Sequence, residues 1–154
     1  VRIGRDTIIY PFTWLERDVT IGRKCEIGPF AKIRSGSKIS DEVVIGSFVE
    51  VVRSKVGAKT YVKHLSYLGD AEVGKKVNVG AGTITANFDG KRKHKTVVRD
   101  RVLLGCGTIL VAPVTVGEGA RTGAGAVIPA RQSVPAGKTV VGIPAKVIRK
   151  GKKI

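Results

Sequence analysis

Aromatic side chains are scarce in this sequence, at 5% of 154 residues, and methionine is absent. The hydrophobic content of 42% is still enough for one domain to bury a core, and that core must be built from aliphatic side chains. Because the chain also holds 20 glycines, we expect the core to be narrow.

Long apolar runs and paired cysteines are also missing. No run approaches the ~18 apolar residues that a membrane-spanning helix needs, so the sequence predicts no membrane partner. The only cysteines, Cys25 and Cys106, lie far apart, unlike the disulfide framework of a small secreted domain. We therefore expect a reduced, cytoplasmic setting. The two histidines, His64 and His94, have no metal-ligand spacing, so no metal site is predicted.

Acidic residues are few, with 12 Asp and Glu against 28 Lys and Arg, which gives a formal charge of +16. The basic residues are scattered rather than gathered into one arm with interleaved aromatic residues, so nucleic acid is not the predicted partner. Two alternatives stay open: a solvated scaffold surface, or a field that attracts a polyphosphate ligand such as coenzyme A.

A branched aliphatic side chain recurs every six residues along the first third of the chain. Nine occur in succession: Ile3, Ile9, Leu15, Ile21, Ile27, Ile33, Ile39, Ile45 and Val51. A small or β-branched residue follows each of the first eight after four positions: Thr7, Thr13, Val19, Cys25, Ala31, Ser37, Val43 and Val49. Neither an α-helix nor a hairpin has this period. One strand and one corner per six residues predict an all-β solenoid of three-sided coils, whose strands pair in parallel at ~4.8 Å.

The six-residue spacing breaks in the middle of the chain. Steps of five residues occur at 51–56 and 68–73, and a polar, Gly-rich stretch at about 86–95 predicts a protruding loop. Departures from a repeat usually mark binding surfaces, so we expect function to centre on 61–96. The tail, about 129–154, is expected to leave the spacing and to cap the last coil, with a basic phosphate-binding patch as the alternative.

Several segments resemble one acetyltransferase family. IGPFAKIRSG, IGSFVEV, HLSYLGDAEVG, VNVGAGTITANFDGKRKHKT and LVAPVTVGEGA are similar to the acetyltransferase domain of the bifunctional glucosamine-1-phosphate acetyltransferase/N-acetylglucosamine-1-phosphate uridylyltransferases. The resemblance covers roughly 20–127 and implies a single-stranded, left-handed parallel β-helix of hexapeptide repeats that acts as a homotrimer. It implies that 1–154 is the acetyltransferase domain and that a nucleotidyltransferase domain, absent from this chain, precedes it; a stand-alone relative is the alternative.

The reaction that the resemblance implies is acetyl transfer from acetyl-CoA to the 2-amino group of glucosamine 1-phosphate, for UDP-N-acetylglucosamine synthesis. The amine must lose a proton, which suits a histidine base, and the family's base falls on His64. Glu50 is expected to orient His64 or the sugar. The family's phosphate and hydroxyl contacts fall on Arg34, Tyr67, Asn78 and Lys93. Asn87 is read either as a further sugar contact or as a turn former.

One family position is altered, because the second phosphate-binding lysine is replaced by the apolar Val52. Arg53 follows immediately and is expected to reach the same phosphate. This change keeps open another acceptor, such as galactosamine 1-phosphate or a nucleotide-linked amino sugar. A non-catalytic trimerising scaffold is the third alternative.

Coenzyme A is expected along a groove between subunits. The residues assigned to it are Ala81, Cys106, Ala124, Lys146 and Arg149, the last two as substitutes for a missing family arginine. The small residues 80–82 either admit the ligand close to the main chain and offer a free amide to an oxyanion, or only permit a tight corner. A nucleophilic role for Cys106 is disfavoured, because no acid or histidine lies beside it in the repeat.

Overall fold

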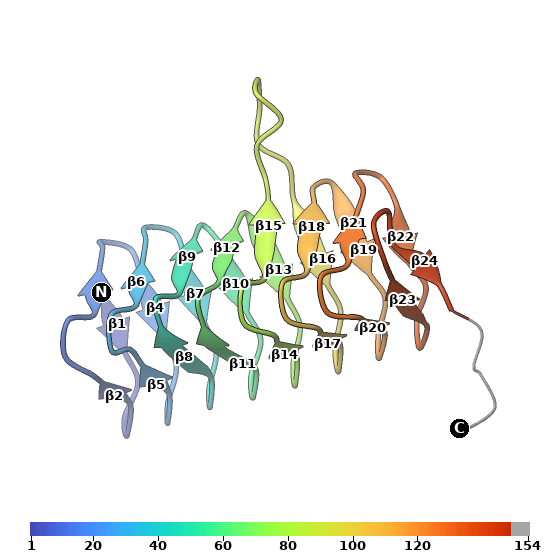
Figure 1. Ribbon diagram of the computed structural model, residues 1–154. Coiled ribbons are helices and arrows are strands. Elements are labelled where there is room, and N and C mark those ends of the chain that lie inside the picture. The colour runs from blue at the N-terminus through green and yellow to red at the C-terminus, as the bar shows by residue number, and fades with distance from the viewer. Residues whose placement is uncertain (149–154) are drawn as a thin grey trace.

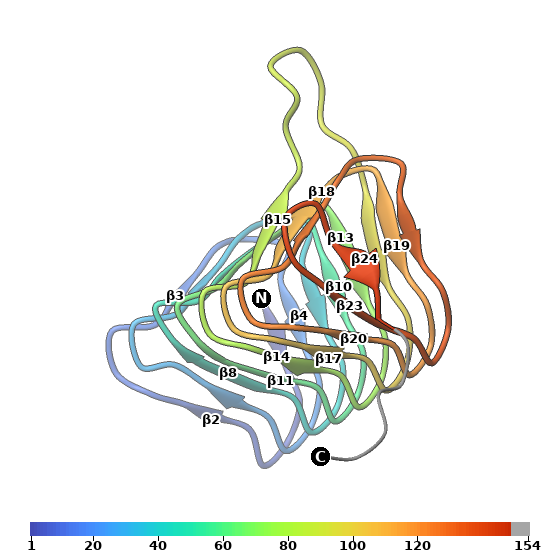
Figure 2. The same ribbon diagram turned by 45° about the vertical axis from the view of Figure 1, so that its right-hand side comes forward.

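The computed structural model describes residues 1–148, and within this range the regular structure consists of strands without helices. The strands form three sheets, and the chain visits the sheets in rotation, so that each sheet gains one strand per coil (Figures 1 and 2). No helix that could cross a membrane occurs within residues 1–148.

Each sheet takes its strands from successive coils. The first sheet contains β1 (Arg2–Ile3), β4 (Thr20–Ile21), β7 (Lys38–Ile39), β10 (Lys55–Val56), β13 (Ala71–Val73), β16 (Thr96–Val98), β19 (Val114–Val116) and β22 (Ser133–Val134). The second contains β2 (Ile8–Ile9), β5 (Glu26–Ile27), β8 (Val44–Ser47), β11 (Tyr61–His64), β14 (Asn78–Val79), β17 (Leu103–Leu104), β20 (Arg121–Thr122), β23 (Thr139–Val141) and β24 (Lys146–Val147). The third contains β3 (Trp14–Leu15), β6 (Lys32–Ile33), β9 (Glu50–Val52), β12 (Tyr67–Gly69), β15 (Ile84–Ala86), β18 (Ile109–Val111) and β21 (Val127–Ile128).

Parallel pairing between successive coils confirms the predicted solenoid. Ile21 pairs with Ile39, and Ile27 pairs with Ile45, so residues 18 positions apart share one row. The fold is the three-sided parallel β-helix expected of hexapeptide repeats and agrees with the left-handed form. Strands of two to four residues suffice because each one is hydrogen-bonded to a neighbouring coil.

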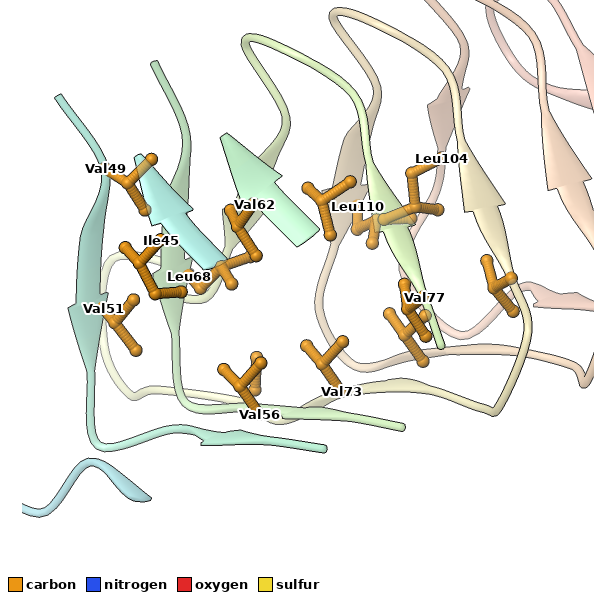
Figure 3. Packing of buried hydrophobic residues seen from close by; sticks show 14 of the residues in the cluster. Ile45, Val49, Val51, Val56, Val62, Leu68, Val73, Val77, Leu104 and Leu110 are labelled. Atoms are coloured by element: carbon orange, nitrogen blue, oxygen red, sulfur yellow. The ribbon is translucent and has the colours of Figure 1, made fainter. Parts of the chain in front are cut away.

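The core is the aliphatic column that the six-residue spacing predicts. Ile27, Ile33, Ile45 and Val51 are completely buried, and side chains from all three sheets meet along the axis (Figure 3). Ile3 is 47% exposed, because its coil has a neighbour on one side only in the described chain. Burial of such side chains, at roughly 1.5–3 kcal/mol each, is the main stabilising contribution.

All three breaks in the spacing fall at one edge of the prism. We call the edge where the chain passes from the third sheet to the first the third–first corner, and the edge from the second to the third the second–third corner. Both five-residue steps, 51–56 and 68–73, are third–first corners, and the excursion at 87–95 leaves the same corner between β15 and β16 (Figure 1). The sheets keep their register across these steps, since Val56 pairs with both Ile39 and Val73.

The expectation that the repeat ends near residue 129 is wrong. Ile128, Val134 and Val140 keep the six-residue spacing and are buried, and β22 and β23 pair in parallel with the preceding coil. Among the strands of residues 1–148, only β24 departs from the repeat, because it pairs antiparallel with β23 and closes the last coil. The prolines in this segment lie outside the parallel strands, so they leave the ladder intact.

Candidate active site

His64 ends β11 at the second–third corner, where its side chain is exposed. Its backbone is held firmly: the Ser66 hydroxyl donates to the His64 carbonyl at 2.8 Å, and His64 pairs with Ser47 of the preceding coil. Leu65, with φ of 47°, turns the chain away directly afterwards. Within residues 1–148 no protein group hydrogen-bonds the imidazole, so the ring is available to a ligand.

A column of small side chains continues from His64 along the same corner. The register Val62 to Val79 sets Ala81 beside His64, and backbone bonds carry the column to Cys106 and Ala124. Gly107 N donates to Ala81 O at 2.7 Å, and Gly125 N donates to Cys106 O at 2.8 Å. Cys106 and Ala124 are exposed. The predicted catalytic base and three predicted cofactor contacts therefore share one edge.

The role of Gly80 is structural. A Cβ at this position would lie 2.5 Å from Cys106 N, so only glycine permits the two coils to pack this closely. Its amide donates to Leu104 O at 2.9 Å and cannot also serve as the free oxyanion donor considered above. Gly82, with φ of 73°, makes the corner turn.

The same corner carries exposed apolar side chains on the N-terminal side of His64. The rings of Phe12, Phe30 and Phe48 stack with centroids 5.0 and 5.3 Å apart, and Leu65 follows them. Phe12, Phe48 and Leu65 are at least 62% exposed. We call these four residues the phenylalanine ladder. A contiguous exposed stripe of this kind is typical of a contact surface.

The third sheet presents Arg34, Glu50 and Tyr67 on neighbouring coils. Arg34 Nη1 donates a hydrogen bond to Glu50 Oε1 at 3.2 Å. Arg34 Nε lies 3.3 Å from Glu16 Oε1, an ion-pair distance without hydrogen-bond geometry. Tyr67 pairs directly with Glu50. The structure therefore gives Glu50 a partner other than His64, which leaves sugar contact as its remaining predicted role. The amide of Ser35 lowers the pKa of Glu16 from its usual value.

A second polar cluster occupies the third–first corner. Asp70 accepts two hydrogen bonds from Arg53, from Nε at 2.7 Å and from Nη2 at 2.8 Å. Its Oδ2 also accepts from Asn87 Nδ2 at 2.5 Å. The Arg53 guanidinium holds the pKa of the Asp70 carboxyl below its usual value, and Asn87 adds to this effect. The five-residue steps bring Arg53 and Asp70 together, because both residues lie at shortened corners.

Gly69 joins this cluster to Tyr67. A Cβ on Gly69 would lie 2.6 Å from both Tyr67 Oη and Asn87 Nδ2, so the two polar groups lie over its bare main chain. Gly69 N donates to the buried Thr85 hydroxyl at 2.8 Å, which fixes the strand beneath them. Tyr67, Asn87 and Arg53 are thus brought together.

The excursion between β15 and β16 adds Lys93. Residues Phe88 and Lys93 form an antiparallel bridge, and Asp89 accepts from the amides of Lys91 and Arg92, both at 2.8 Å. Asp89 Oδ2 also lies 2.6 Å from His94 Nε2. The Arg92 amide, the His94 ring and the Lys91 amide lower the Asp89 pKa.

A pocket of about 380 Å³ lies between this loop and the corner. It is lined by Arg53, Lys55, Asp70, Ala71, Glu72, Lys93, His94 and Lys95. The cations exceed the carboxylates, so the pocket suits an anion. Two of the predicted substrate contacts, Arg53 and Lys93, line it.

The remaining predicted residues lie elsewhere. Asn78 is exposed on β14 of the second sheet, between Tyr61 and Leu103, and a single chain does not bring it near Arg34 or Tyr67. Lys146 is exposed on β24 in the terminal hairpin. Arg149 lies outside the described residues. Within residues 1–148, no three His, Cys, Asp or Glu side chains gather into a possible metal site.

Sequence reasoning missed Asp70, which connects more predicted contacts than any other side chain described here. The available signal was its place at a shortened corner, one residue after Gly69. Its partners could not be read from spacing alone, because the side-chain pairing spans a coil of 17 residues.

Comparison with known proteins agrees with this geometry. The sequence profile of the family described as "Bacterial transferase hexapeptide (six repeats)" matches residues 18–53. The bifunctional protein GlmU of Chromobacterium violaceum is 49% identical over 141 residues, which cover 92% of this chain and 30% of that protein. GlmU of Nitrosospira multiformis is 51% identical over 128 residues, which cover 83% of this chain and 28% of that protein.

The chain thus spans about 30% of the length of the curated relatives it matches. Among solved structures, PerB from Caulobacter crescentus has a TM-score of 0.63 at 21% identity, covering 93% of this chain and 57% of that chain. This likeness shows a shared fold. Together, the six-residue spacing, the three-sided coils and the profile match over residues 18–53 show that the chain is built from hexapeptide repeats similar to those of the bacterial transferase family.

Proposed function

We propose that this chain transfers the acetyl group of acetyl-CoA to the 2-amino group of glucosamine 1-phosphate, in UDP-N-acetylglucosamine biosynthesis. The observation that carries the proposal is the 49% and 51% identity to two GlmU proteins across most of this chain. An exposed His64 with an unengaged ring, beside a column of small residues, supports it.

The chemistry assigned to His64 is general-base catalysis. The imidazole takes a proton from the attacking amine as its nitrogen bonds to the thioester carbonyl carbon. The tetrahedral adduct then collapses, the carbon–sulfur bond breaks, and coenzyme A leaves as a thiol after taking up a proton. Because the amine attacks directly, Cys106 is not needed as a nucleophile. The proposal requires no metal for this step.

The ligand sites are part of the same proposal and take their residues from the family resemblance. Ala81, Cys106 and Ala124 are assigned to acetyl-CoA along the second–third corner. Lys146 in the terminal hairpin is assigned to the same ligand, as is Arg149, which lies outside the described residues. The acetyltransferase domain of PglB, which has this fold at 23% identity, is solved in complex with acetyl coenzyme A. Arg34, Tyr67, Arg53, Asn87 and Lys93 are assigned to the sugar phosphate.

The proposed assembly is a cytoplasmic homotrimer whose sites are shared between subunits. Asn78 lies on the second sheet, whereas Arg34 and Tyr67 lie on the third, so the predicted contacts converge only if a neighbouring copy supplies some of them. The exposed phenylalanine ladder beside His64 supports a subunit contact at this corner.

A second acceptor is favoured by Val52, which is 2% exposed and carries no charge toward a phosphate. Galactosamine 1-phosphate, or a nucleotide-linked amino sugar, is the alternative substrate on the same scaffold. A panel of glucosamine and galactosamine, each with and without the 1-phosphate, separates these acceptors by their kcat/KM.

The direct test is His64→Ala in a thiol-release assay with acetyl-CoA and glucosamine 1-phosphate. We expect kcat to fall by about 10² to 10⁴ because a positioned base is lost, with the melting temperature retained. Lys38→Ala, an exposed substitution on the first sheet, serves as the control and should keep full activity. An unchanged rate in His64→Ala would leave only the scaffold alternative.

A further inference from the structure

Asp70 is held in place from both sides by the backbone. Its amide donates to Val52 O at 3.0 Å, and its carbonyl accepts from Thr96 N at 3.2 Å. Its φ of 49° repeats that of Arg53, at 45°, on the preceding coil. The two residues therefore occupy equivalent places on successive shortened corners, and their side chains leave the main chain in the same direction.

Both carboxylate oxygens of Asp70 are occupied by two side chains that the proposed function assigns to the substrate. Arg53 binds them through Nε and Nη2, and Asn87 binds Oδ2 through Nδ2. This leaves Arg53 Nη1 and Asn87 Oδ1 without a partner among the hydrogen bonds of the described chain. Asn87 is 6% exposed, so its amide is fixed rather than mobile.

The charge of Asp70 alone would weaken an anion site. The same pocket holds the cations Lys55, Lys93 and Lys95, and Lys95 is itself engaged with Glu72 at 2.8 Å. A carboxylate in this setting is useful for orientation, because a bidentate partner fixes the plane of a guanidinium that would otherwise rotate freely. Fixing it beforehand lowers the entropy lost when a ligand binds.

We infer that Asp70 is a positioning residue that holds Arg53 and Asn87 as one preformed contact for the sugar phosphate. The inference rests on the proposed function, and it assigns Asp70 no contact with the substrate. Gly69 completes the arrangement, since its missing Cβ lets the Tyr67 hydroxyl lie beside the Asn87 amide. Asp70 thus links two predicted substrate contacts, Arg53 and Asn87, and Gly69 brings Tyr67 beside them.

The test compares Asp70→Asn and Asp70→Glu with the unmodified protein. We expect Asp70→Asn to raise the KM for glucosamine 1-phosphate about tenfold, the equivalent of roughly 1.4 kcal/mol, while kcat and the KM for acetyl-CoA change less than about twofold. Asp70→Glu keeps the charge and should recover part of the loss. A purely structural role would not separate the two KM values.

Asp41→Asn is the matched control. Asp41 accepts from Arg23 Nη2 at 2.7 Å across neighbouring coils, but at the corner between the first and second sheets. The substitution Asp41→Asn removes a comparable Arg–Asp pair and should leave the KM values for glucosamine 1-phosphate and acetyl-CoA unchanged. A double-mutant cycle with Arg53→Met adds a second readout: effects on KM that are less than additive support the inference, and additive effects overturn it.

The outcomes separate the two proposals. If the unmodified protein does not acetylate glucosamine 1-phosphate, the proposed function fails and this inference fails with it. If the unmodified protein is active and Asp70→Asn keeps its KM for the sugar phosphate, only the positioning role of Asp70 is overturned.

Discussion

Within residues 1–148, two Arg–Asp pairs connect neighbouring coils, and Arg53–Asp70 is the less exposed of the two. The Asp70 side chain is 21% exposed, against 37% for Asp41 in the pair with Arg23. Exposed pairs contribute about 0–1 kcal/mol each, so the many charges on this surface add little to stability. The Arg53–Asp70 pair differs because Asn87 shares its carboxylate.

The pH dependence of stability provides a prediction for Asp70. Its pKa is lowered below the usual 3.8, so the pair stabilises the protein above the unfolded pKa, and this contribution is lost as the pH falls through the lowered folded value. The difference in unfolding free energy between the unmodified protein and Asp70→Asn should therefore be constant above about pH 5 and should decline only below that range.

Urea unfolding between pH 3 and 8 measures this difference. A gap that narrows between pH 6 and 8 would contradict the prediction, because no lowered carboxyl pKa lies there. Asp41→Asn, whose carboxyl pKa is also lowered by Arg23, should show the same direction of change.

For single residues, the sequence predicted whether a side chain points outward better than it predicted which side chain it contacts. The spacing places His64 off the two inward positions of its six-residue unit, which predicts an outward side chain at a corner, and the structure shows it exposed. The pairing of Glu50 with Arg34 was not predicted, because it depends on which of several neighbouring cations the carboxylate selects.

Among the elements, the excursion between β15 and β16 carries the clearest consequence. Its turn depends on Asp89, which accepts from two amides and contacts His94. None of these contacts reaches the core, so the loop and the coils should respond separately to substitution.

Asp89→Ala should loosen the loop while leaving the solenoid intact. We expect a higher KM for glucosamine 1-phosphate, because Lys93 loses its fixed place, and a melting temperature within about 2 °C of the unmodified protein. Hydrogen exchange should accelerate at 88–94 and stay slow in β15 and β16. The control is Arg101→Ala, which removes an exposed ion pair with Glu118 at the corner between the first and second sheets. Slow exchange in the loop of Asp89→Ala would contradict the prediction.

The sequence predicted the coils because the core sets their six-residue spacing, and its inward positions accept few side chains that are not aliphatic. The prediction was wrong at the C-terminal end, where the tail was expected to leave the spacing from about residue 129, although Val134 and Val140 keep it. The spacing also did not reveal that Thr85 points inward, since its coil runs into the excursion. There a hydroxyl takes the place of an aliphatic side chain and accepts a hydrogen bond from Gly69 N.

In the whole molecule, the predicted site residues are distributed over different faces. His64 lies on the second–third corner, Asn78 on the second sheet, and the Asp70 cluster on the third–first corner. Residues on these different faces of one prism cannot all contact the same ligand, because the coils are stacked at fixed register.

Complementation between variants tests whether subunits share the site. His64→Ala and Asn78→Ala, each expected to be weakly active alone, should regain activity when unfolded and refolded as a mixture, because some sites then combine two intact residues. Sedimentation should show a trimer of the 16.4 kDa chain in all samples. Activity in the mixture that equals the mean of the separate variants would contradict a shared site.

The third–first corner tolerates five residues, six residues or a long excursion without shifting the strands on either side. A foreign peptide could therefore be inserted at this edge, for instance at the two-residue turn 112–113 between β18 and β19, and the remaining coils should assemble as before. The third–first corner is thus an insertion site at which new binding loops can be added while the strands keep their register.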